Sequence, residues 1–342
     1  SFTANYASAS ASLNATVGTR TATASAKGGA IYVNSTATAT YITIYGNSFA
    51  TNYAIATASA YTAFTTSADG GAIYAGNYVT ALIESNSTTA TSFNANYTDT
   101  STAAASNGGA IYLAQNSTLT IQKLAGTTAT YSAIFNGNGG SPALTDNGGA
   151  IYAENATNTY IYNAEFVSNH ATSNGGAIYA ADGNYGSSTK ANVEIYGSTF
   201  GTLSGLSSNS DGNFVDSGNG GAVYIGAYGT LTIADSGATH SLFANNYTSS
   251  GNGGAIYLAK ATTANITNAK FVYNHTAAGS GGAIFADNGT DATAQIKGGT
   301  INIKGSTFGT TYVSLANTDG NYATISGGAI YSGNYTTVNI EA

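Results

Sequence analysis

The chain contains no cysteine, methionine or tryptophan, and its one proline is Pro142. Without cysteine there can be no disulfide framework, no thiolate metal site and no cysteine nucleophile. The lack of cysteine, methionine and tryptophan also removes oxidation-sensitive groups, which suits a protein exposed outside the cell. No run of about 18 apolar residues occurs, so the sequence predicts no membrane-spanning helix.

Charge is also scarce. Only 7% of the 342 residues are charged, and the formal net charge is -7. The eight lysines and arginines are scattered along the chain, which argues against nucleic acid as a partner. A polar surface with so few charges is less protected against self-association than a charged one.

One short motif is abundant instead. Gly-Gly-Ala-Ile-Tyr occurs nine times, with Val223 in place of Ile in one copy and Phe285 in place of Tyr in another. Successive copies lie 27 to 46 residues apart, so one unit needs no more than 27 residues and longer units carry insertions. The nine copies begin at Gly28, Gly70, Gly108, Gly148, Gly175, Gly220, Gly253, Gly281 and Gly327.

Short stretches that alternate apolar and polar residues follow the motif, as half-buried strands do. No stretch sustains the apolar period of 3.6 residues that a helix needs. The predicted strands are Tyr41–Tyr45, Leu119–Ile121, Val193–Ile195, Leu231–Ile233, Ile301–Ile303 and Val338–Ile340.

A second motif, Phe-x-x-Asn followed by Tyr or His, comes after these strands. Phe135 to Asn138 is a partial copy, whereas Phe200 and Phe308 keep the aromatic residue but lack the Asn. An asparagine at this corner is expected to stack on its equivalents and bond to the backbone of a turn. The segment between this motif and the next Gly-Gly is interpreted as a variable loop. Full copies run from Phe2 to Tyr6, Phe49 to Tyr53, Phe93 to Tyr97, Phe166 to His170, Phe243 to Tyr247 and Phe271 to His275.

A 27-residue unit with three short strands and tight corners is one coil of a parallel β-helix. We therefore predict an all-β chain, residues 1–342, that forms a single right-handed parallel β-helix domain of about nine to ten coils. At roughly 4.8 Å per coil, nine coils make a rod of about 43 Å. The Ile of each Gly-Gly-Ala-Ile-Tyr copy should form one inward stack, and the phenylalanines another.

If the isoleucines point inward, alternation along the strand places the tyrosine of each motif on the outside. One interpretation is an aromatic strip used for contact, and the other is a strip covered by an insertion. The predicted strip consists of Tyr32, Tyr74, Tyr112, Tyr152, Tyr179, Tyr224, Tyr257 and Tyr331, with Phe285 in the eighth position.

Both ends of the chain fall in mid-coil. Phe2, Asn5 and Tyr6 open it with a complete Phe-x-x-Asn-Tyr motif, and Val338 and Ile340 lie in a strand of the kind that elsewhere precedes that motif. Uncapped strand edges are templates for pairing with another chain. The chain is then either a segment of a longer solenoid or a subunit that stacks head to tail on copies of itself.

The sequence offers little for catalysis. Glycoside hydrolysis requires a pair of carboxylates, and equivalent positions in neighbouring coils do not provide such a pair. His170 and His275 share one repeat position three coils apart, too far to share a metal, and are interpreted as surface aromatics. The loop from Asp211 to Asn219 has oxygen ligands but no EF-hand spacing, so a solvated turn is the simpler interpretation. We predict no catalytic residues, no cofactor and no metal site.

The pairing of repeated Gly-Gly-Ala-(Ile/Val) with Phe-x-x-Asn resembles the polymorphic outer-membrane protein family of chlamydial autotransporters. It also resembles the wider class of pectate-lyase-like β-helix surface adhesins. The resemblance runs from Phe2 to Ile340. It implies a secreted passenger displayed on the cell surface with an adhesive or structural role. The absence of cysteine and the low charge depart from the chlamydial pattern.

These observations predict a non-catalytic, extracellular structural protein that assembles head to tail into a surface filament or sheath. The first alternative is a surface adhesin that binds glycans or other cell-surface components through exposed Tyr and Asn. The second is a carbohydrate-active β-helix enzyme. Turnover of any glycan would establish the enzyme, and ligand binding that is lost on Tyr→Ala changes would support the adhesin.

Overall fold

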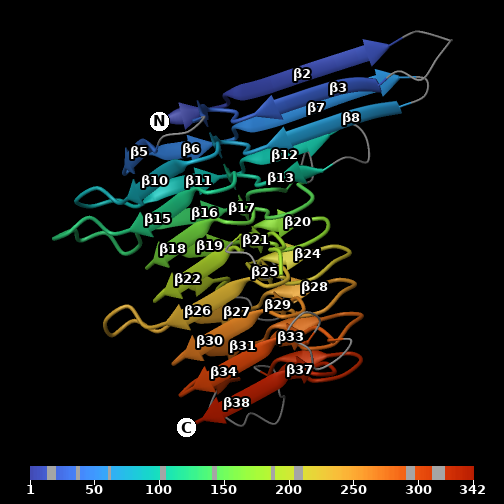
Figure 1. Cartoon of the computed structure of the whole chain (residues 1–342). Coiled ribbons are helices and arrows are strands. Elements are labelled where there is room, and N and C mark those ends of the chain that lie inside the picture. Colours follow the sequence, from blue (N-terminus) through green and yellow to red (C-terminus); the bar gives the residue numbers. More distant parts are fainter. Residues whose placement is uncertain are drawn as a thin grey trace.

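The computed structural model describes residues 1–13, 21–35, 39–60, 63–100, 105–140, 145–185, 189–203, 211–289, 297–309 and 320–342. Within these ranges every regular element is a β-strand, and every pair of named strands is parallel. The strands stack in three nine-stranded sheets, so the chain is a parallel β-helix, as predicted (Figure 1). The N-terminal coil lies at one end of the stack and the C-terminal coil at the other.

The first sheet contains the Gly-Gly-Ala-Ile-Tyr strands. Gly175 has φ +62°, and a Cβ on Gly176 would lie 2.1 Å from the carbonyl oxygen of Gly221 in the next coil. The first glycine thus provides the left-handed turn, and the second lets adjacent coils approach. The strands are β4 (Ile31–Val33), β9 (Ile73–Ala75), β14 (Ile111–Leu113), β17 (Ile151–Ala153), β21 (Ile178–Ala180), β25 (Val223–Ile225), β29 (Ile256–Leu258), β33 (Ile284–Ala286) and β37 (Ile330–Ser332).

The second sheet contains the alternating strands, and all six predicted strands lie in it. Inward residues such as Ile161 and Ile233 are fully buried, whereas their neighbours along the strand face outward. The strands are β5 (Thr40–Tyr45), β10 (Val79–Glu84), β15 (Thr118–Gln122), β18 (Asn158–Tyr162), β22 (Asn192–Tyr196), β26 (Thr230–Ala234), β30 (Thr263–Thr267), β34 (Thr300–Lys304) and β38 (Thr337–Glu341).

The third sheet carries the phenylalanines. Their rings stack face to face from Phe2 to Phe308 with centroids 4.6 to 5.0 Å apart, and they form one continuous core with the inward isoleucines. Both predicted stacks are confirmed. The strands are β1 (Phe2–Thr3), β6 (Ser48–Ala50), β11 (Thr91–Asn94), β16 (Ala133–Asn136), β19 (Glu165–Val167), β23 (Thr199–Phe200), β27 (Leu242–Ala244), β31 (Lys270–Val272) and β35 (Thr307–Phe308).

A fourth, five-stranded sheet follows the asparagine corner in the later coils. Its strands are only two residues long, because the chain turns at once toward the next Gly-Gly. They are β20 (His170–Ala171), β24 (Phe214–Val215), β28 (Tyr247–Thr248), β32 (His275–Thr276) and β36 (Tyr322–Ala323).

In the first coils the same position holds much longer strands, which project from the stack (Figure 1). One sheet has the order β12-β7-β2 and the other β13-β8-β3. We call the four long strands β2, β3, β7 and β8 the arm. The bounds are β2 (Tyr6–Leu13), β3 (Thr21–Lys27), β7 (Tyr53–Ala60), β8 (Ala63–Asp69), β12 (Tyr97–Thr100) and β13 (Ser106–Asn107).

Alanine fills the space between the two layers of the arm. Ala54, Ala56 and Ala68 are fully buried there, and Ala24 and Ala26 are nearly so. This corrects the prediction of variable loops after Phe-x-x-Asn, because in the first two coils these segments are strands. Their Ala/Ser/Thr alternation has the period of two that marks a strand, but it lacks the large apolar residues on which the prediction relied.

Candidate contact surfaces

The corner between the third and fourth sheets holds a stack of asparagine side chains, which we call the amide ladder. In each step the backbone N–H and Nδ2 of one asparagine both donate to Oδ1 of the next, at 2.8 to 3.1 Å. From the second step on, Nδ2 also donates to the carbonyl oxygen of the phenylalanine one coil earlier. The ladder runs through Asn5, Asn52, Asn96, Asn138, Asn169, Asn213, Asn246, Asn274 and Asn321.

The ladder is longer than the sequence motif predicts. Phe200 and Phe308 were expected to lack an asparagine, but Asn213 and Asn321 take that place after insertions. The predicted solvated turn at 211–219 therefore contains a ladder residue and strand β24. The missed signal is the aromatic residue that follows each asparagine, here Phe214 and Tyr322, since it recurs at nearly every ladder position.

The amide ladder has a direction, so its two ends differ. At the first coil, Oδ1 of Asn5 accepts no hydrogen bond from the described residues. At the last coil, the N–H of Asn321 has no described acceptor, and Phe308 is the next phenylalanine carbonyl in the series. The first coil thus offers an acceptor, Oδ1 of Asn5, and the last coil offers a donor, the N–H of Asn321.

A second row of side chains precedes the Gly-Gly pairs and runs in the opposite sense. Asn147 donates through Nδ2 to Asn107, and Asn107 donates to Oδ1 of Asp69 at 3.3 Å. Burial raises the pKa of the Asp69 carboxyl to about 6, although the hydrogen bond from Asn107 and the charge of Lys27 act against the shift. The row therefore ends on a buried carboxylate at the base of the arm.

The tyrosines of the first sheet also stack, with ring centroids 4.8 to 5.2 Å apart through seven steps from Tyr32 to Phe285. Alternation is confirmed, since the rings lie on the opposite side from the buried isoleucines. Of the two interpretations, the open aromatic strip does not hold for part of this tyrosine ladder. Tyr74 and Tyr112 are 7% exposed and Tyr257 is 8% exposed, because each ring is covered by its stacked neighbours and by adjoining side chains such as Ala114.

Carboxylates lie along the hydroxyl side of the tyrosine ladder. The Tyr112 hydroxyl donates to the Glu154 carboxylate, and burial raises the pKa of Tyr112 well above its ordinary value. Burial and the charge of Asp182 raise the pKa of Tyr179 to about 12. These phenols stay protonated in neutral solution and act as hydrogen-bond donors. The tyrosine ladder is thus a second, amphipathic core layer.

The two histidines of the fourth sheet are buried, which corrects their interpretation as surface aromatics. His170 is 8% exposed and stacks on Phe214, and His275 is 3% exposed between Tyr247 and Tyr322. Burial lowers the pKa of both rings. They are buried because the next coil stacks directly on each ring.

The outer face of the second sheet carries side chains that are half-buried in the middle coils. Its outward residues form three columns along the stack, and those of the middle coils include Tyr160, Tyr162, Glu194 and Tyr196. The Tyr162 and Tyr196 rings stack at 4.8 Å. The Glu194 carboxylate accepts from the Tyr196 hydroxyl at 2.7 Å and from Asn192 Nδ2 at 2.9 Å.

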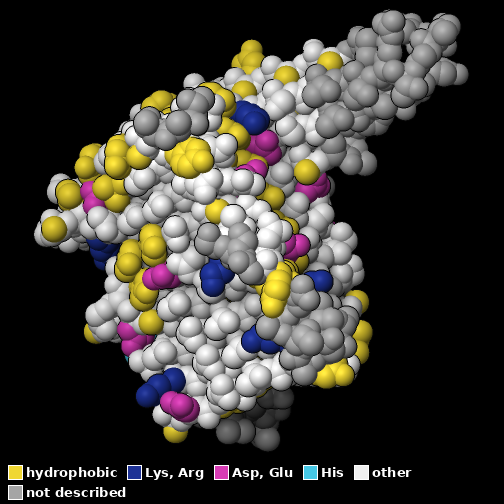
Figure 2. Space-filling model, viewed as in Figure 1, with side chains coloured by type: hydrophobic (Ala, Val, Ile, Leu, Met, Phe, Trp, Pro, Cys, Tyr) yellow, Lys and Arg dark blue, Asp and Glu magenta, His cyan; other side chains and the backbone are white. Residues whose placement is uncertain are grey.

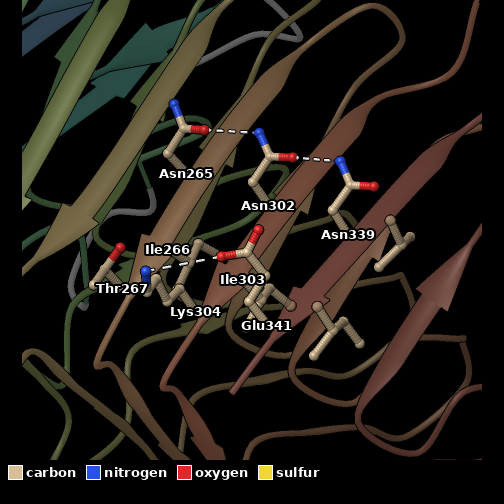
Figure 3. A pocket seen from close by; sticks show the side chains of 10 residues that line it. Asn265, Ile266, Thr267, Asn302, Ile303, Lys304, Asn339 and Glu341 are labelled. Carbon is tan, nitrogen blue, oxygen red and sulfur yellow. Dashed lines mark hydrogen bonds and ion pairs between the residues drawn. The ribbon is translucent and has the colours of Figure 1, made fainter.

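Two hollows lie on this sheet. One, of about 240 Å³, is lined by Thr120, Gln122, Tyr160 and Tyr162. The other, of about 630 Å³, lies over β30, β34 and β38 and is bordered by the asparagine row shown in Figure 3. That row is Asn265, Asn302 and Asn339, linked by hydrogen bonds of 2.8 and 2.7 Å.

Charged side chains do not gather on the face in Figure 2. Across the residues that the structure describes, no three His, Asp or Glu side chains gather closely enough to hold a metal ion. The described part of the chain contains no helix of the length and apolarity needed to cross a membrane.

The residues predicted to mediate stacking lie on the two end coils. Phe2 stacks on Phe49 at 4.8 Å, and Tyr6, 64% exposed, stacks on Tyr53. At the other end Val338 packs on the core, whereas Ile340 is 69% exposed.

Comparison with known families finds three matches to the Chlamydia polymorphic membrane protein repeat, at residues 132–154, 163–181 and 240–259. Each match contains one ladder asparagine and one strand of the first sheet: β17, β21 or β29. In these three segments the chain is similar to the polymorphic membrane protein repeat, and this similarity is consistent with an outer-membrane or cell-surface location. No curated protein and no solved structure matches the chain.

Proposed function

We propose that the chain is a non-catalytic structural protein of a cell surface and that copies of it stack end to end into a filament. The observation that carries this proposal is the direction of the amide ladder. Donors at Asn321 and a carbonyl acceptor at Phe308 face one way, and the Asn5 amide, whose Oδ1 accepts from none of the described residues, faces the other.

One copy placed on another at the coil spacing continues every bond of the ladder. The Asn321 N–H would donate to Oδ1 of Asn5 in the next copy, whose Nδ2 would donate to the Phe308 carbonyl oxygen. Both are bonds that every internal step already makes. A heterologous interface of this kind propagates, because each copy that joins presents a fresh end.

The other rows of the coil match in the same placement. The Phe2 ring of the next copy would stack on Phe308, and its Tyr6 would stack on Tyr322. In these two rows the described stacked rings lie 3.9 to 5.4 Å apart. Further residues of the same polypeptide would use these groups equally well, so the test uses the 342-residue chain itself.

The test is electron microscopy of the purified chain, with sedimentation across a concentration series. We expect filaments with an axial repeat of about 43 Å, which is nine coils at roughly 4.8 Å. Chains that remain monomeric at every concentration would contradict the proposal.

A matched pair of variants at Ile340 identifies the interface. The Thr337 N–H bonds toward β34, and successive residues along a parallel strand bond to opposite neighbours, so the Ile340 N–H faces the open edge. Ile340→Pro removes that donor without removing a bond inside the fold. It should abolish filaments and leave the circular dichroism spectrum unchanged. Ile340→Ala, which keeps the N–H, should still form them. If Ile340→Pro forms normal filaments, the open edge of β38 is not the contact between copies.

A further inference from the structure

The outer face of the second sheet has features that neither the repeat core nor end-to-end stacking requires. Its inward residues are the aliphatic core, but its outward columns carry tyrosine rings and amides in the middle coils. These side chains lie on internal strands, away from the end coils, so they depend on neither terminus.

We infer that this face binds an extended, neutral polysaccharide that lies along the coil axis. The first observation is the hollow of about 240 Å³ between Gln122, Tyr160 and Tyr162. It lies below the 300–1,000 Å³ typical of sites that enclose a drug-sized ligand, and it suits one small ring. Tyrosine offers a rigid apolar ring face and a polar tip at low entropic cost.

Polar groups around this hollow are held in place by one another. The Glu84 carboxylate accepts from Gln122 Nε2 at 2.6 Å, and the Glu194 carboxylate accepts from Asn192 and Tyr196. Such bonds fix the side chains and leave further lone pairs on the Glu194 oxygens for a ligand, whereas Glu84 itself is buried. A ligand rich in hydroxyl groups can donate to these oxygens.

The charge of the face decides between neutral and acidic polymers. The charged side chains in its three columns are Glu84, Glu194, Lys304 and Glu341. Lys304 lies 3.8 Å from Glu341, and both side chains are mostly exposed. With one lysine and three carboxylates, the face repels a uronate chain and provides no cluster of cations to bind one.

The second hollow gives the ligand its length and direction. The Asn265–Asn302–Asn339 row lies on the same sheet and borders that hollow (Figure 3). From β18 to β34 is four coil steps, or about 19 Å. Between the two hollows the same outward columns continue through Glu194 on β22 and Thr232 on β26. A ligand that contacts both hollows must therefore be a chain and not a single sugar.

Isothermal titration calorimetry with cellohexaose, maltohexaose, chitohexaose and hexagalacturonate tests the inference. We expect saturable binding of at least one neutral hexasaccharide and binding of hexagalacturonate that is about tenfold weaker or absent. If none of the three neutral hexasaccharides binds, or if hexagalacturonate binds most tightly, the inference is overturned.

Variants then locate the site. The double change Tyr160→Thr with Tyr162→Thr keeps good strand formers and should weaken binding about tenfold or more. Asn302→Ala should weaken it about threefold, since a polar contact on an open face contributes less. Tyr185→Thr removes an exposed loop tyrosine and serves as the matched control. Wild-type affinity in the double variant would overturn the site, and wild-type affinity in Asn302→Ala would overturn the extended binding mode.

The tyrosine hollow lies on internal strands, but β38 with Ile340 borders the second hollow, so the separation from the stacking test uses the wild-type chain below the concentration at which filaments form. Those monomers should bind the hexasaccharide as tightly as the filaments do. Loss of binding in those monomers would mean that the ligand site is formed between copies, against the inference.

Discussion

The arm and the coil stack are both parallel sheets in register, but they are held together by different groups. In the coil stack the interior is built from phenylalanine and isoleucine, and an asparagine corner ties each coil to the next. In the arm the buried apolar side chains of the described residues are alanines, as at Ala54, Ala56 and Ala68, and Thr66 is buried with them. A buried phenylalanine contributes about 1.5–3 kcal/mol, and a methyl group contributes far less.

The comparison shows that strand pairing and core building are separable in this chain. Alanine lets the two layers of the arm lie close together, and the hydrogen bonds between strands are retained. Folding of the arm nevertheless buries little apolar surface. We therefore expect the arm to open before the stack does, as regions with few buried apolar contacts do. The three changes below test that difference, from the largest expected effect to the smallest.

Removal of a ring from the stack should cost far more than removal of a methyl group from the arm. Phe166 is fully buried between Phe135 and Phe200, so Phe166→Ala should lower the free energy of unfolding by about 3–5 kcal/mol. Ala56→Gly in the arm should lower it by about 1 kcal/mol. Urea unfolding measures both, and equal losses would show that the two regions do not differ as described.

An asparagine inside the amide ladder should contribute more to the free energy of unfolding than one at the end of the ladder. Asn169 accepts two bonds from Asn138 and donates to Asn213 and to the Phe135 carbonyl. Asn169→Ala leaves these buried groups unpaired and should cost about 3–4 kcal/mol, since each unsatisfied group costs about 1–3. Asn5→Ala at the end coil, the matched control, should cost about 1 kcal/mol. Equal losses from the two variants would contradict a cooperative ladder.

The base of the arm should respond to pH through Asp69. Its pKa of about 6 is above the ordinary 3.8, so folding favours the protonated form. The carboxyl thus contributes stability that is fully present below about pH 4 and is lost as the pH rises through about 6. Two pKa units correspond to roughly 3 kcal/mol, which is an upper bound here because Lys27 lies close.

Asp69→Asn removes this titration and still accepts the hydrogen bond from Asn107. It should stabilise the chain at pH 7.5 and have little effect at pH 4, in urea unfolding followed by circular dichroism. Asp99→Asn, which changes a half-buried carboxyl on β12 to an amide, is the matched control. If the free energy of unfolding depends on pH in Asp69→Asn as it does in the wild type, Asp69 is not the group responsible.

Much of the fold could be predicted from the sequence because two motifs recur at fixed places in each coil. Period-two alternation predicted strands whose apolar residues, such as Ile195, lie inside, and the phenylalanine motif predicted a corner stack. The prediction failed where a motif was interrupted. Asn213 and Asn321 follow insertions, so a fixed Phe-x-x-Asn spacing cannot find them.

The strands of the arm and the burial of the tyrosine ladder escaped prediction for a different reason. Strand interiors built from alanine carry no hydrophobic contrast between the two faces, so Ala7 and Ser8 look alike to a pattern search. Exposure of Tyr112 depends on its stacked neighbours and on Ala114, which alternation along one strand cannot reveal. The outer-face hollows arise from residues of neighbouring coils, and their positions follow from register.

The most direct test of the account is a distance along the stack. Thr80 and Thr337 occupy one outward column, seven coil steps apart, and a chain without native cysteine can be spin-labelled at Thr80→Cys and Thr337→Cys. Double electron–electron resonance should give one narrow distribution near 34 Å, which is seven steps of roughly 4.8 Å, broadened only by the label. A broad distribution, or one centred far from that distance, would mean that the coils do not stack in register.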